Sequence, residues 1–437
     1  MAPTGRTPSA APARSRIAWK STLINGMVSY LDAGAIVTTG TVLVMYKAHF
    51  GLGPSQIGQL SALLTIMIAV GSVFGGWIGD RIGRRKVFTT TILLYAVGSL
   101  LLVWVPSVAM LYVGVVLVGL GVGADLPVSL ASIAEQNREG AKAKAVQFSQ
   151  IIWSAGQLVS MVIAIIVGNM GVFGGRILYL HLLVVAIVVL ILRFGVPESD
   201  EWLNERKLRR SSAASGRPRF TWTEVLKPPY LFALLGVSLF YGFVNVAANT
   251  FGEFSTYIYT TVAGLTVSQA STAGFIAIAI AVITSLLFMR VADMRSKRYF
   301  WFTFGGIIKI LGFIVPIALG GSLGTILVAN LASNVSGQLS GEPAFKIWAQ
   351  ELFPARLRAL AQGIGICFAR VVAAIVALFT PALLGLPMGV NGLFLIIAGL
   401  VFIAISIGFF WLRRTPTARD REGAIGEEVP APALAAE

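Results

Sequence analysis

The sequence predicts an all-α membrane protein in which twelve transmembrane helices form two pseudo-symmetric six-helix bundles. Of its 437 residues, 56% are hydrophobic and only 12% are charged, and the mean hydropathy is +0.81. A soluble protein could not expose so apolar a surface to water. Apolar stretches of roughly 20 residues, the length that a helix needs to cross a bilayer, recur twelve times. They are continuous and do not alternate with polar residues, so they predict helices and not barrel strands.

The longest polar interval divides these spans six and six. It covers residues 196–228, is rich in Arg and Lys, and is predicted to be a cytoplasmic linker between bundles at 18–195 and 229–413. Residues 1–17 and 414–437 lack apolar periodicity and are predicted to be disordered cytoplasmic tails. The predicted spans are 22–46, 55–79, 87–105, 108–133, 145–170, 174–195, 229–256, 267–290, 300–320, 324–350, 358–386 and 391–412.

The positive charges predict the orientation in the membrane. The net charge is +15, and 29 of the 34 Lys and Arg residues fall on one side if the N-terminus is cytoplasmic. Only Lys47 and Arg176 fall in outward loops. This asymmetry is the positive-inside pattern, which predicts a multi-pass protein of the cell inner membrane with both termini cytoplasmic. Because topology accounts for the charge, no nucleic-acid partner is expected.

Sites for soluble-type catalysis are not found in the sequence. It contains no zinc-ligand cluster, no Walker-type phosphate loop and no nucleophile elbow. We therefore expect no metal, no cofactor and no enzymatic activity.

Short motifs recur in the two halves. The loop after the second span is GDRIGRRK, residues 79–86, and the loop after the eighth is ADMRSKR, residues 292–298. Asp80 and Asp293 in these loops are 213 residues apart, and Glu135 and Glu351 after the fourth and tenth spans are 216 apart. The similar offsets predict duplicated halves, an architecture typical of secondary transporters.

These motifs also place acids and bases at the cytoplasmic helix ends. Such pairs can close an inner gate, and each solvated pair contributes only about 0–1 kcal/mol, so several together bias a two-state equilibrium without locking it. Simple positive-inside anchoring is the alternative for any single Arg. The predicted gating sets are Asp80 with Arg84 and Arg85, Glu135 with Lys142, Asp293 with Arg298, and Glu351 with Arg358.

Three motifs resemble one family. Residues 79–86 resemble the signature between spans two and three of the major facilitator superfamily. Pro197-Glu198-Ser199 with Trp202 and Leu203 resembles the motif after span six of its sugar porter branch, and the segment from Glu351 to Arg358 resembles that branch's E-x-[FY]-P-x-x-x-R element. The resemblance covers nearly all the membrane domain. It implies alternating access to a central site, with a monomer as the expected oligomeric state.

Ionisable residues inside the spans are candidates for proton coupling. Each costs about 2.5–3.5 kcal/mol on insertion scales, so few are kept without a use. Asp32 resembles the titrating Asp of proton-coupled sugar porters, but the family's partner Arg in span four is missing, since Val115 or Val116 lies there. Asp125 resembles the span-four Asp of phosphate–proton porters. We expect coupling through Asp32, Asp125 or both, with Glu342 as a third candidate; uniport or exchange is the alternative.

Amide side chains on two spans are candidates for substrate binding. Gln150 and Gln157 share one helix face, and Tyr241, Asn245 and Asn249 share another at i, i+4 and i+8. Amides both donate and accept hydrogen bonds, which suits hydroxyl ligands; hydrogen bonding between helices is the alternative. By resemblance to bacterial xylose–proton symporters, Gln150, Gln157 and Asn245 fall on sugar-binding positions. The family's tandem Gln is replaced by Leu239 and Phe240.

The C-terminal half carries two cations near the expected midplane. Lys346 shares a helix face with Gln338 and Glu342, and Arg370 lies in the eleventh predicted span. Lys346 and Arg370 could bind a carboxylate or phosphate, or they could be neutralised by Glu342 while the substrate is uncharged. The sequence leaves both interpretations open.

The sequence therefore predicts a secondary active transporter driven by the proton gradient. Its expected partners are protons, the lipid bilayer and a small polar solute such as a sugar, polyol or sugar acid. A proton symporter of an organic anion or phosphate is the alternative, and a non-transporting membrane sensor is the third hypothesis.

Overall fold

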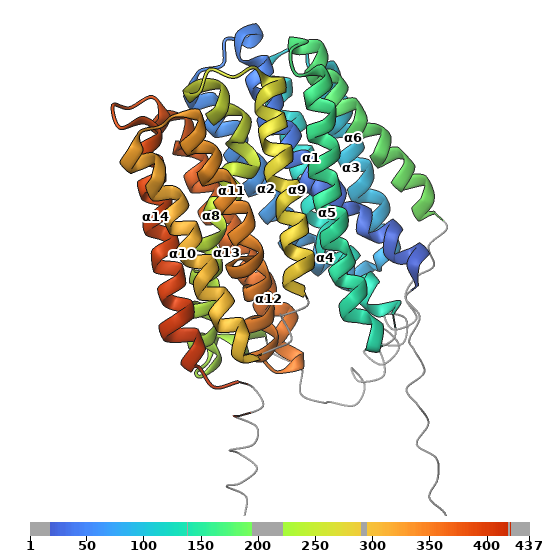
Figure 1. The fold of residues 1–437 in the computed structure, drawn as a ribbon. Coiled ribbons are helices and arrows are strands. Elements are labelled where there is room, and N and C mark those ends of the chain that lie inside the picture. Colours follow the sequence, from blue (N-terminus) through green and yellow to red (C-terminus); the bar gives the residue numbers. More distant parts are fainter. Residues whose placement is uncertain (1–17, 138, 195–221, 290–294, 418–419, 421–437) are drawn as a thin grey trace, which may run out of the picture.

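The structure, a computed structural model, describes residues 18–137, 139–194, 222–289, 295–417 and 420. Over these residues the chain is almost entirely helical and contains no strand. The helices run side by side as one elongated bundle (Figure 1). The predicted all-α membrane fold is therefore confirmed.

The first six predicted spans are six helices. Each predicted range lies within its helix or extends past its end by at most three residues. Most helices are longer than the predicted spans, because their polar ends continue the helix beyond the apolar run. The helices are α1 (Trp19–Phe50), α2 (Pro54–Ile82), α3 (Arg84–Trp104), α4 (Val108–Glu135), α5 (Glu139–Val167) and α6 (Gly171–Arg193).

The second half repeats this series. A short 3-10 helix η1 (Trp222–Leu226) precedes it, and the last helix ends in a π turn and a 3-10 turn, η2 (Ile407–Trp411) and η3 (Leu412–Arg414). Its helices are α8 (Tyr230–Val262), α9 (Val267–Met289), α10 (Arg295–Leu319), α11 (Leu323–Ser340), α12 (Glu342–Glu351), α13 (Ala355–Leu384) and α14 (Gly389–Ser406).

The tenth predicted span is broken into α11 and α12 at Gly341. Gly341 has φ −104° and ψ −131°, which is not helical. Pro343 follows and cannot donate a backbone hydrogen bond to a preceding turn, so the helix restarts at Glu342. In the described residues, 11 helices are long and apolar enough to cross a membrane. The 18-residue α11 is not one of them, because polar residues such as Asn330 and Asn334 occupy its face.

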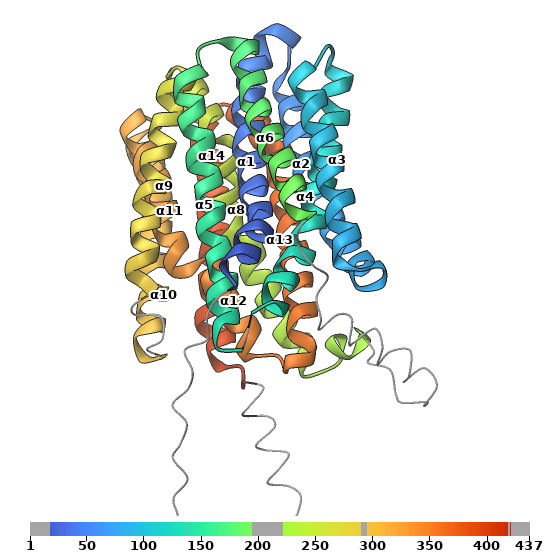
Figure 2. The ribbon, with the colours of Figure 1, turned by 90° about the vertical axis from the view of Figure 1, so that its right-hand side faces the viewer.

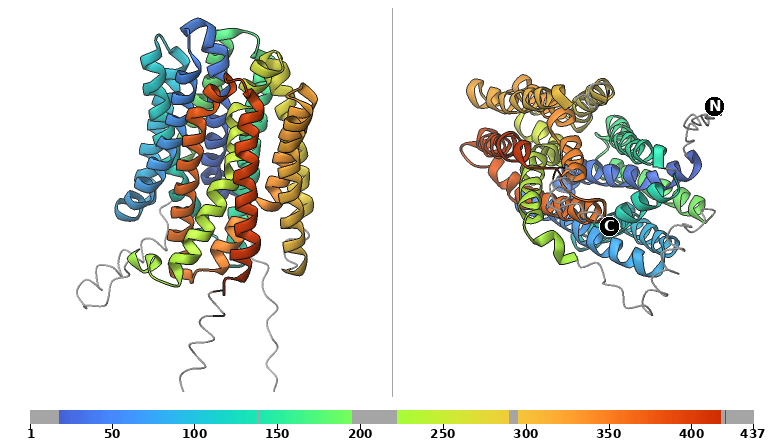
Figure 3. Two further views of the ribbon diagram at one scale, coloured as in Figure 1. Left: turned by 90° about the vertical axis from the view of Figure 1, so that its left-hand side faces the viewer. Right: turned by 90° about the horizontal axis from the view of Figure 1, so that it is seen from below.

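The packing of the helices repeats in the two halves. In the first, α1 packs against α4, α5 and α6, while α4 packs against α2 and α3. In the second, α8 packs against α11, α13 and α14, while α11 packs against α9 and α10. The corresponding helices thus make corresponding contacts, as internal duplication predicts. Seen along the helices, α1–α6 and α8–α14 occupy different sides of the bundle (Figure 3).

The two halves meet mainly through three helix pairs in the described part of the chain, namely α1 with α8, α2 with α13, and α5 with α9. The last pair lies side by side in Figure 2. We call the end of the bundle at which α1 begins and η3 ends the terminal face, and the other end the loop face. Both ends of the described chain lie in the lower half of the bundle in Figure 1.

The halves are pressed together near the loop face. Gly40 of α1 lies so close to the backbone carbonyl of Glu253 in α8 that a Cβ there would collide with it. Thr41 and Thr256 share a hydrogen bond of 3.2 Å between the same helices, and Ser268 of α9 donates one to the Ile165 carbonyl of α5. The structure is therefore closed on the loop face.

The predicted linker and both predicted tails lie mostly outside the described residues, so their boundaries stay predictions. So does the domain division at 195–196 and 228–229, although the two sets of helices agree with it.

Close packing of α2 on α4 gives a stability prediction. A Cβ on Gly123 would meet the backbone of Ile68, whereas one on Gly399 of α14 would meet nothing within 4 Å. Gly123→Ala should therefore lower the free energy of unfolding by about 1–3 kcal/mol, the usual cost of overpacking. Thermal unfolding in detergent should show a lower midpoint for Gly123→Ala and an unchanged one for the control Gly399→Ala; equal midpoints would contradict this packing.

Candidate functional site

A central cavity of about 180 Å³ lies between the two halves. Its wall is formed by α1 and α5 from the first half and by α8–α13 from the second. Toward the loop face the lining reaches Ser255 and Gly274, and toward the terminal face it reaches Leu286, three residues before α9 ends. The cavity thus lies on the terminal side of the contacts that close the loop face.

All five predicted amide and phenol ligands line this cavity. Gln150 and Gln157 enter from α5, and Tyr241, Asn245 and Asn249 enter from α8 on the opposite side. The structure therefore brings together side chains that are about 90 residues apart in sequence. Tyr241 is held in place by Phe345, whose ring stacks on it with centroids 4.1 Å apart. Polar groups from both halves can contact one solute, as alternating access requires.

Asp32 of α1 is joined to both halves beside the cavity. Its Oδ2 atom accepts a 2.9 Å hydrogen bond from Trp153 Nε1 of α5 and lies 3.4 Å from Nη2 of Arg370 in α13. Asp32 is 1% exposed, while Arg370 lines the cavity. In the family that the sequence resembles, the partner Arg of this acid lies in span four. Here the partner is Arg370, which belongs to the other half of the protein.

Glu342 and Lys346 form a second ion pair, at 2.8 Å, on one turn of α12. Lys346 Nζ also donates a 3.3 Å hydrogen bond to Oε1 of Gln150 across the cavity. Glu342 lies in the first turn of α12, where the positive end of the helix dipole favours an acid. Both cations predicted from the sequence are therefore paired with an acid.

Lys309 of α10 is a third cation in the cavity lining, and it belongs to neither of these ion pairs. It is 1% exposed, lines the cavity, and has no hydrogen bond or ion pair with any described residue. Its Nζ atom lies 4.0 Å from the position of a Cβ on Gly337, so the missing side chain leaves space beside the ammonium group.

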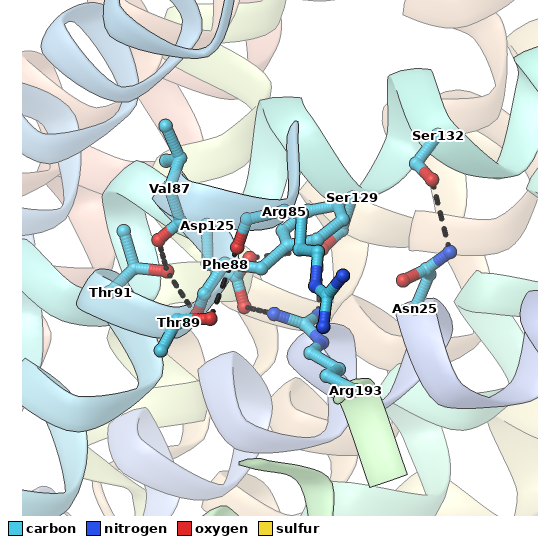
Figure 4. A network of polar contacts seen from close by, with 10 residues as sticks. All are labelled: Asn25, Arg85, Val87, Phe88, Thr89, Thr91, Asp125, Ser129, Ser132 and Arg193. Atoms are coloured by element: carbon cyan, nitrogen blue, oxygen red, sulfur yellow. Dashed lines mark hydrogen bonds and ion pairs between the residues drawn. The ribbon is translucent and has the colours of Figure 1, made fainter. Parts of the chain in front are cut away.

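Asp125 lies elsewhere. It is fully buried within the first half and is not part of the cavity lining. Arg193 Nη1, at the end of α6, lies 2.6 Å from Asp125 Oδ2, and Arg193 Nη2 donates a 2.8 Å hydrogen bond to Ser129 (Figure 4). The guanidinium also lies 4.5 Å from the centre of the Phe88 ring. The structure thus does not bring Asp125 to the other candidate coupling residues, and its predicted coupling role stays untested.

The burial of Arg193 and the hydrogen bond of Trp153 were not predicted from the sequence. A cation at a helix end satisfies the positive-inside pattern whether or not it is buried, so the sequence does not distinguish Arg193 from the exposed cations near it. Trp153 lies beside the polar face of α5, and only the packing of α1 on α5 shows that its ring nitrogen donates to Asp32.

Most of the predicted gating side chains lie outside the described part of the chain. Two are described: Arg85 donates a 3.2 Å hydrogen bond to the Phe194 carbonyl, and Glu351 is half-buried at the end of α12. The side chains that lie outside it are those of Asp80, Arg84, Glu135, Lys142, Asp293, Arg298 and Arg358.

Family comparison decides the class of protein. The Major Facilitator Superfamily model matches residues 22–377. The chain belongs to the Major Facilitator Superfamily. It is therefore a multi-pass membrane transporter of small molecules and not an enzyme, as the sequence predicted.

Individual relatives and solved structures agree with this assignment. The chain is 32% identical to the minor myo-inositol transporter IolF of Bacillus subtilis over 91% of both chains. It is 31% identical to the niacin transporter NiaP of Acinetobacter baylyi over 41% of this chain and 40% of that one. Its fold resembles the xylose transporter XylE from E. coli with a TM-score of 0.75 and 17% identity, covering 92% of this chain and 98% of that chain.

The Asp125–Arg193 pair gives a prediction on stability. Removing one partner leaves the other charge buried without compensation, so Asp125→Asn or Arg193→Gln should lower the free energy of unfolding by about 3–5 kcal/mol. The double variant should lose less free energy of unfolding than the two single variants lose together, because it leaves no uncompensated buried charge. Lys346→Gln, which breaks a half-exposed pair, is the control and should lose about 0–1 kcal/mol. Thermal unfolding in detergent measures all four, and additive losses would show that the two charges do not interact.

Proposed function

We propose that this transporter takes up a neutral polyhydroxylated solute, a sugar or cyclic polyol, together with protons. The observation that carries the proposal is the Asp32–Arg370 contact, which joins a titratable acid of one half to a cation of the other beside an amide-lined cavity. The cavity recognises the solute, and the acid links its movement to the proton gradient.

The chemistry of the lining suits hydroxyl groups. Gln157, Asn245 and Asn249 offer donors and acceptors without net charge. The Lys346 and Arg370 charges are offset by Glu342 and Asp32, which favours an uncharged solute over an anion bound by these two cations. The myo-inositol transporter among the relatives is consistent with this class of solute.

Coupling follows from the charge state of Asp32. When Asp32 is ionised it attracts Arg370 of the other half; when it is protonated this attraction is lost. Protonation therefore changes the free energy that holds α1 and α13 together beside the cavity, and a ligand shifts a two-state equilibrium only through such a difference between states.

The positive-inside pattern supports placing the terminal face in the cytoplasm of a cell with an inner membrane. The structure then corresponds to a state closed to the outside. In this proposal a monomer is the transporting unit, and the acid–base sets of the terminal face, Asp80 and Glu351 among them, form the inner gate.

Asp32→Asn tests the coupling. In proteoliposomes with an inward proton gradient, wild-type protein should accumulate a radiolabelled inositol or sugar above its external concentration. Asp32→Asn should still exchange internal for external solute but should no longer accumulate it, because its side chain cannot change charge. Wild-type accumulation without a proton gradient, or unchanged accumulation by Asp32→Asn, would contradict proton symport through this residue.

Lys309 supports a second candidate function, transport of a carboxylate such as a sugar acid. Lys346 and Arg370 are paired with acids, whereas the Lys309 ammonium group has no partner among the described residues. Lys309 could therefore bind one negative charge on the solute. Niacin, the solute named for one relative, is a carboxylic acid. A phosphate ester would meet the same charge requirement.

Lys309→Gln separates the two candidates. If a carboxylate binds Lys309, the variant should raise the KM for a uronate roughly ten- to hundredfold, the usual effect of losing a charged hydrogen bond, and leave a neutral polyol unaffected. Asn249→Ala removes an amide of the cavity lining and should weaken the binding of both solutes to the same extent. Failure of wild-type protein to transport any anion, or an equal effect of Lys309→Gln on both solutes, would exclude the carboxylate.

A further inference from the structure

Glu253 is a buried acid that the proposed transport cycle does not yet use. It lies on α8, one residue after Gly252 of the cavity lining, but its side chain is outside that lining. It is 3% exposed and faces α1 and α2 of the other half, where Gly40 contacts its backbone carbonyl and Thr65 contacts its carboxyl group. Glu253 is thus part of the interface that closes the loop face.

The carboxyl group has little to balance a negative charge. Thr65 donates one long hydrogen bond, 3.5 Å, to Oε2, while Oε1 is buried without a partner. No Lys or Arg nitrogen of the described residues lies within 4.0 Å of it. Arg370 is the charged neighbour that acts on it from α13, and Arg370 is already paired with Asp32. An ionised carboxylate is unfavourable in such a place, so the buried form must be neutral.

A neighbouring hydroxyl group is placed to accept a hydrogen bond from protonated Glu253. Ser61 lies one helical turn before Thr65 on α2, is fully buried, and its oxygen has no hydrogen-bond partner. Thr65 contacts the Glu253 carboxyl group, and Ser61 lies beside that group on the same face of α2. An O–H on Oε1 directed at Ser61 would give both buried oxygens a partner.

We infer that Glu253 is a proton-binding site whose occupation is linked to closure of the loop face. When this face is closed, the carboxyl group is buried and carries a proton. Opening separates α8 from α1 and α2, which exposes the group to water and allows it to ionise. Because the closed state binds one more proton here than the open state, a lower pH favours closure and a higher pH favours opening.

Distance measurements across the loop face test this link without any transported solute. Exposed Ala48 of α1 and Thr261 of α8, replaced by Cys in a Cys367→Ser background, carry spin labels on the two halves. Pulsed EPR in lipid nanodiscs from about pH 5 to about pH 8 then follows the distance between the labels. This distance depends neither on substrate nor on a gradient. The proton link at Glu253 can therefore be absent in a protein that still transports its solute with protons, and it can be present in a protein that does not.

In the otherwise wild-type protein, the population with a long distance should grow as the pH rises. Glu253→Gln, which is neutral at every pH, should stay at the short distance throughout the range. A wild-type distribution that does not change with pH would overturn the inference. So would a Glu253→Gln variant that shows the same change as wild type.

Ser61→Ala provides a second variant that keeps the acid in place. It removes the group proposed to accept a hydrogen bond from protonated Glu253, so closure should require a lower pH. The midpoint of the distance change should move to lower pH by roughly half to one unit. Ser99→Ala is the matched control, because Ser99 is a buried hydroxyl without a hydrogen-bond partner on α3, a helix that packs mainly against α4 and α6 of its own half. An unmoved midpoint in Ser61→Ala, or an equal shift in Ser99→Ala, would count against the site.

Discussion

The low polarity of the interior is the constraint on which the rest of this structure depends. Water cannot reach a charge held between apolar helices, so a charge buried away from the cavity requires a partner, and in this protein the partner often comes from a distant part of the chain. Asp125 is paired with Arg193 from another helix of the same half, whereas Asp32 is paired with Arg370 from the other half. The first pair stabilises one bundle, and the second can respond to relative movement of the two bundles.

Close approach of the helices and the position of the cavity are related. Gly40 and Gly58, which have no side chain, allow α1 and α2 to contact the backbone of α8 and α13 near the loop face. With that face closed, the polar side chains of α5 and α8 face each other across the space that remains toward the terminal face. A change of access therefore requires the loop-face contacts to separate, and any buried group among them, such as Glu253, changes its environment at the same time.

The charges of the cavity limit which solutes it can bind. Lys346 and Arg370 each lie against an acid and so do not form a free anion site. Among the described residues of the cavity lining, the cation without such an acid is Lys309. The same helix faces supply amides that bind hydroxyl groups. A neutral polyol and a sugar acid would thus share most of their contacts with the cavity. Only the sugar acid would also use the charge of Lys309.

By itself the sequence determined the class of protein, the positions of most spans, the internal repeat and the amides of the cavity. The spans and the shared helix faces follow from local composition and helical periodicity. The class of protein and the binding positions also rest on motifs that resemble those of a known family. The break at Gly341 could also be predicted from the sequence, because Pro343 follows it closely. The partners of Asp32 and Asp125, the isolation of Lys309 and the burial of Glu253 were decided only by the tertiary structure. The physical reason is that periodicity shows which residues share a helix face, whereas the neighbouring helix decides whether that face meets lipid, a cavity or a charge.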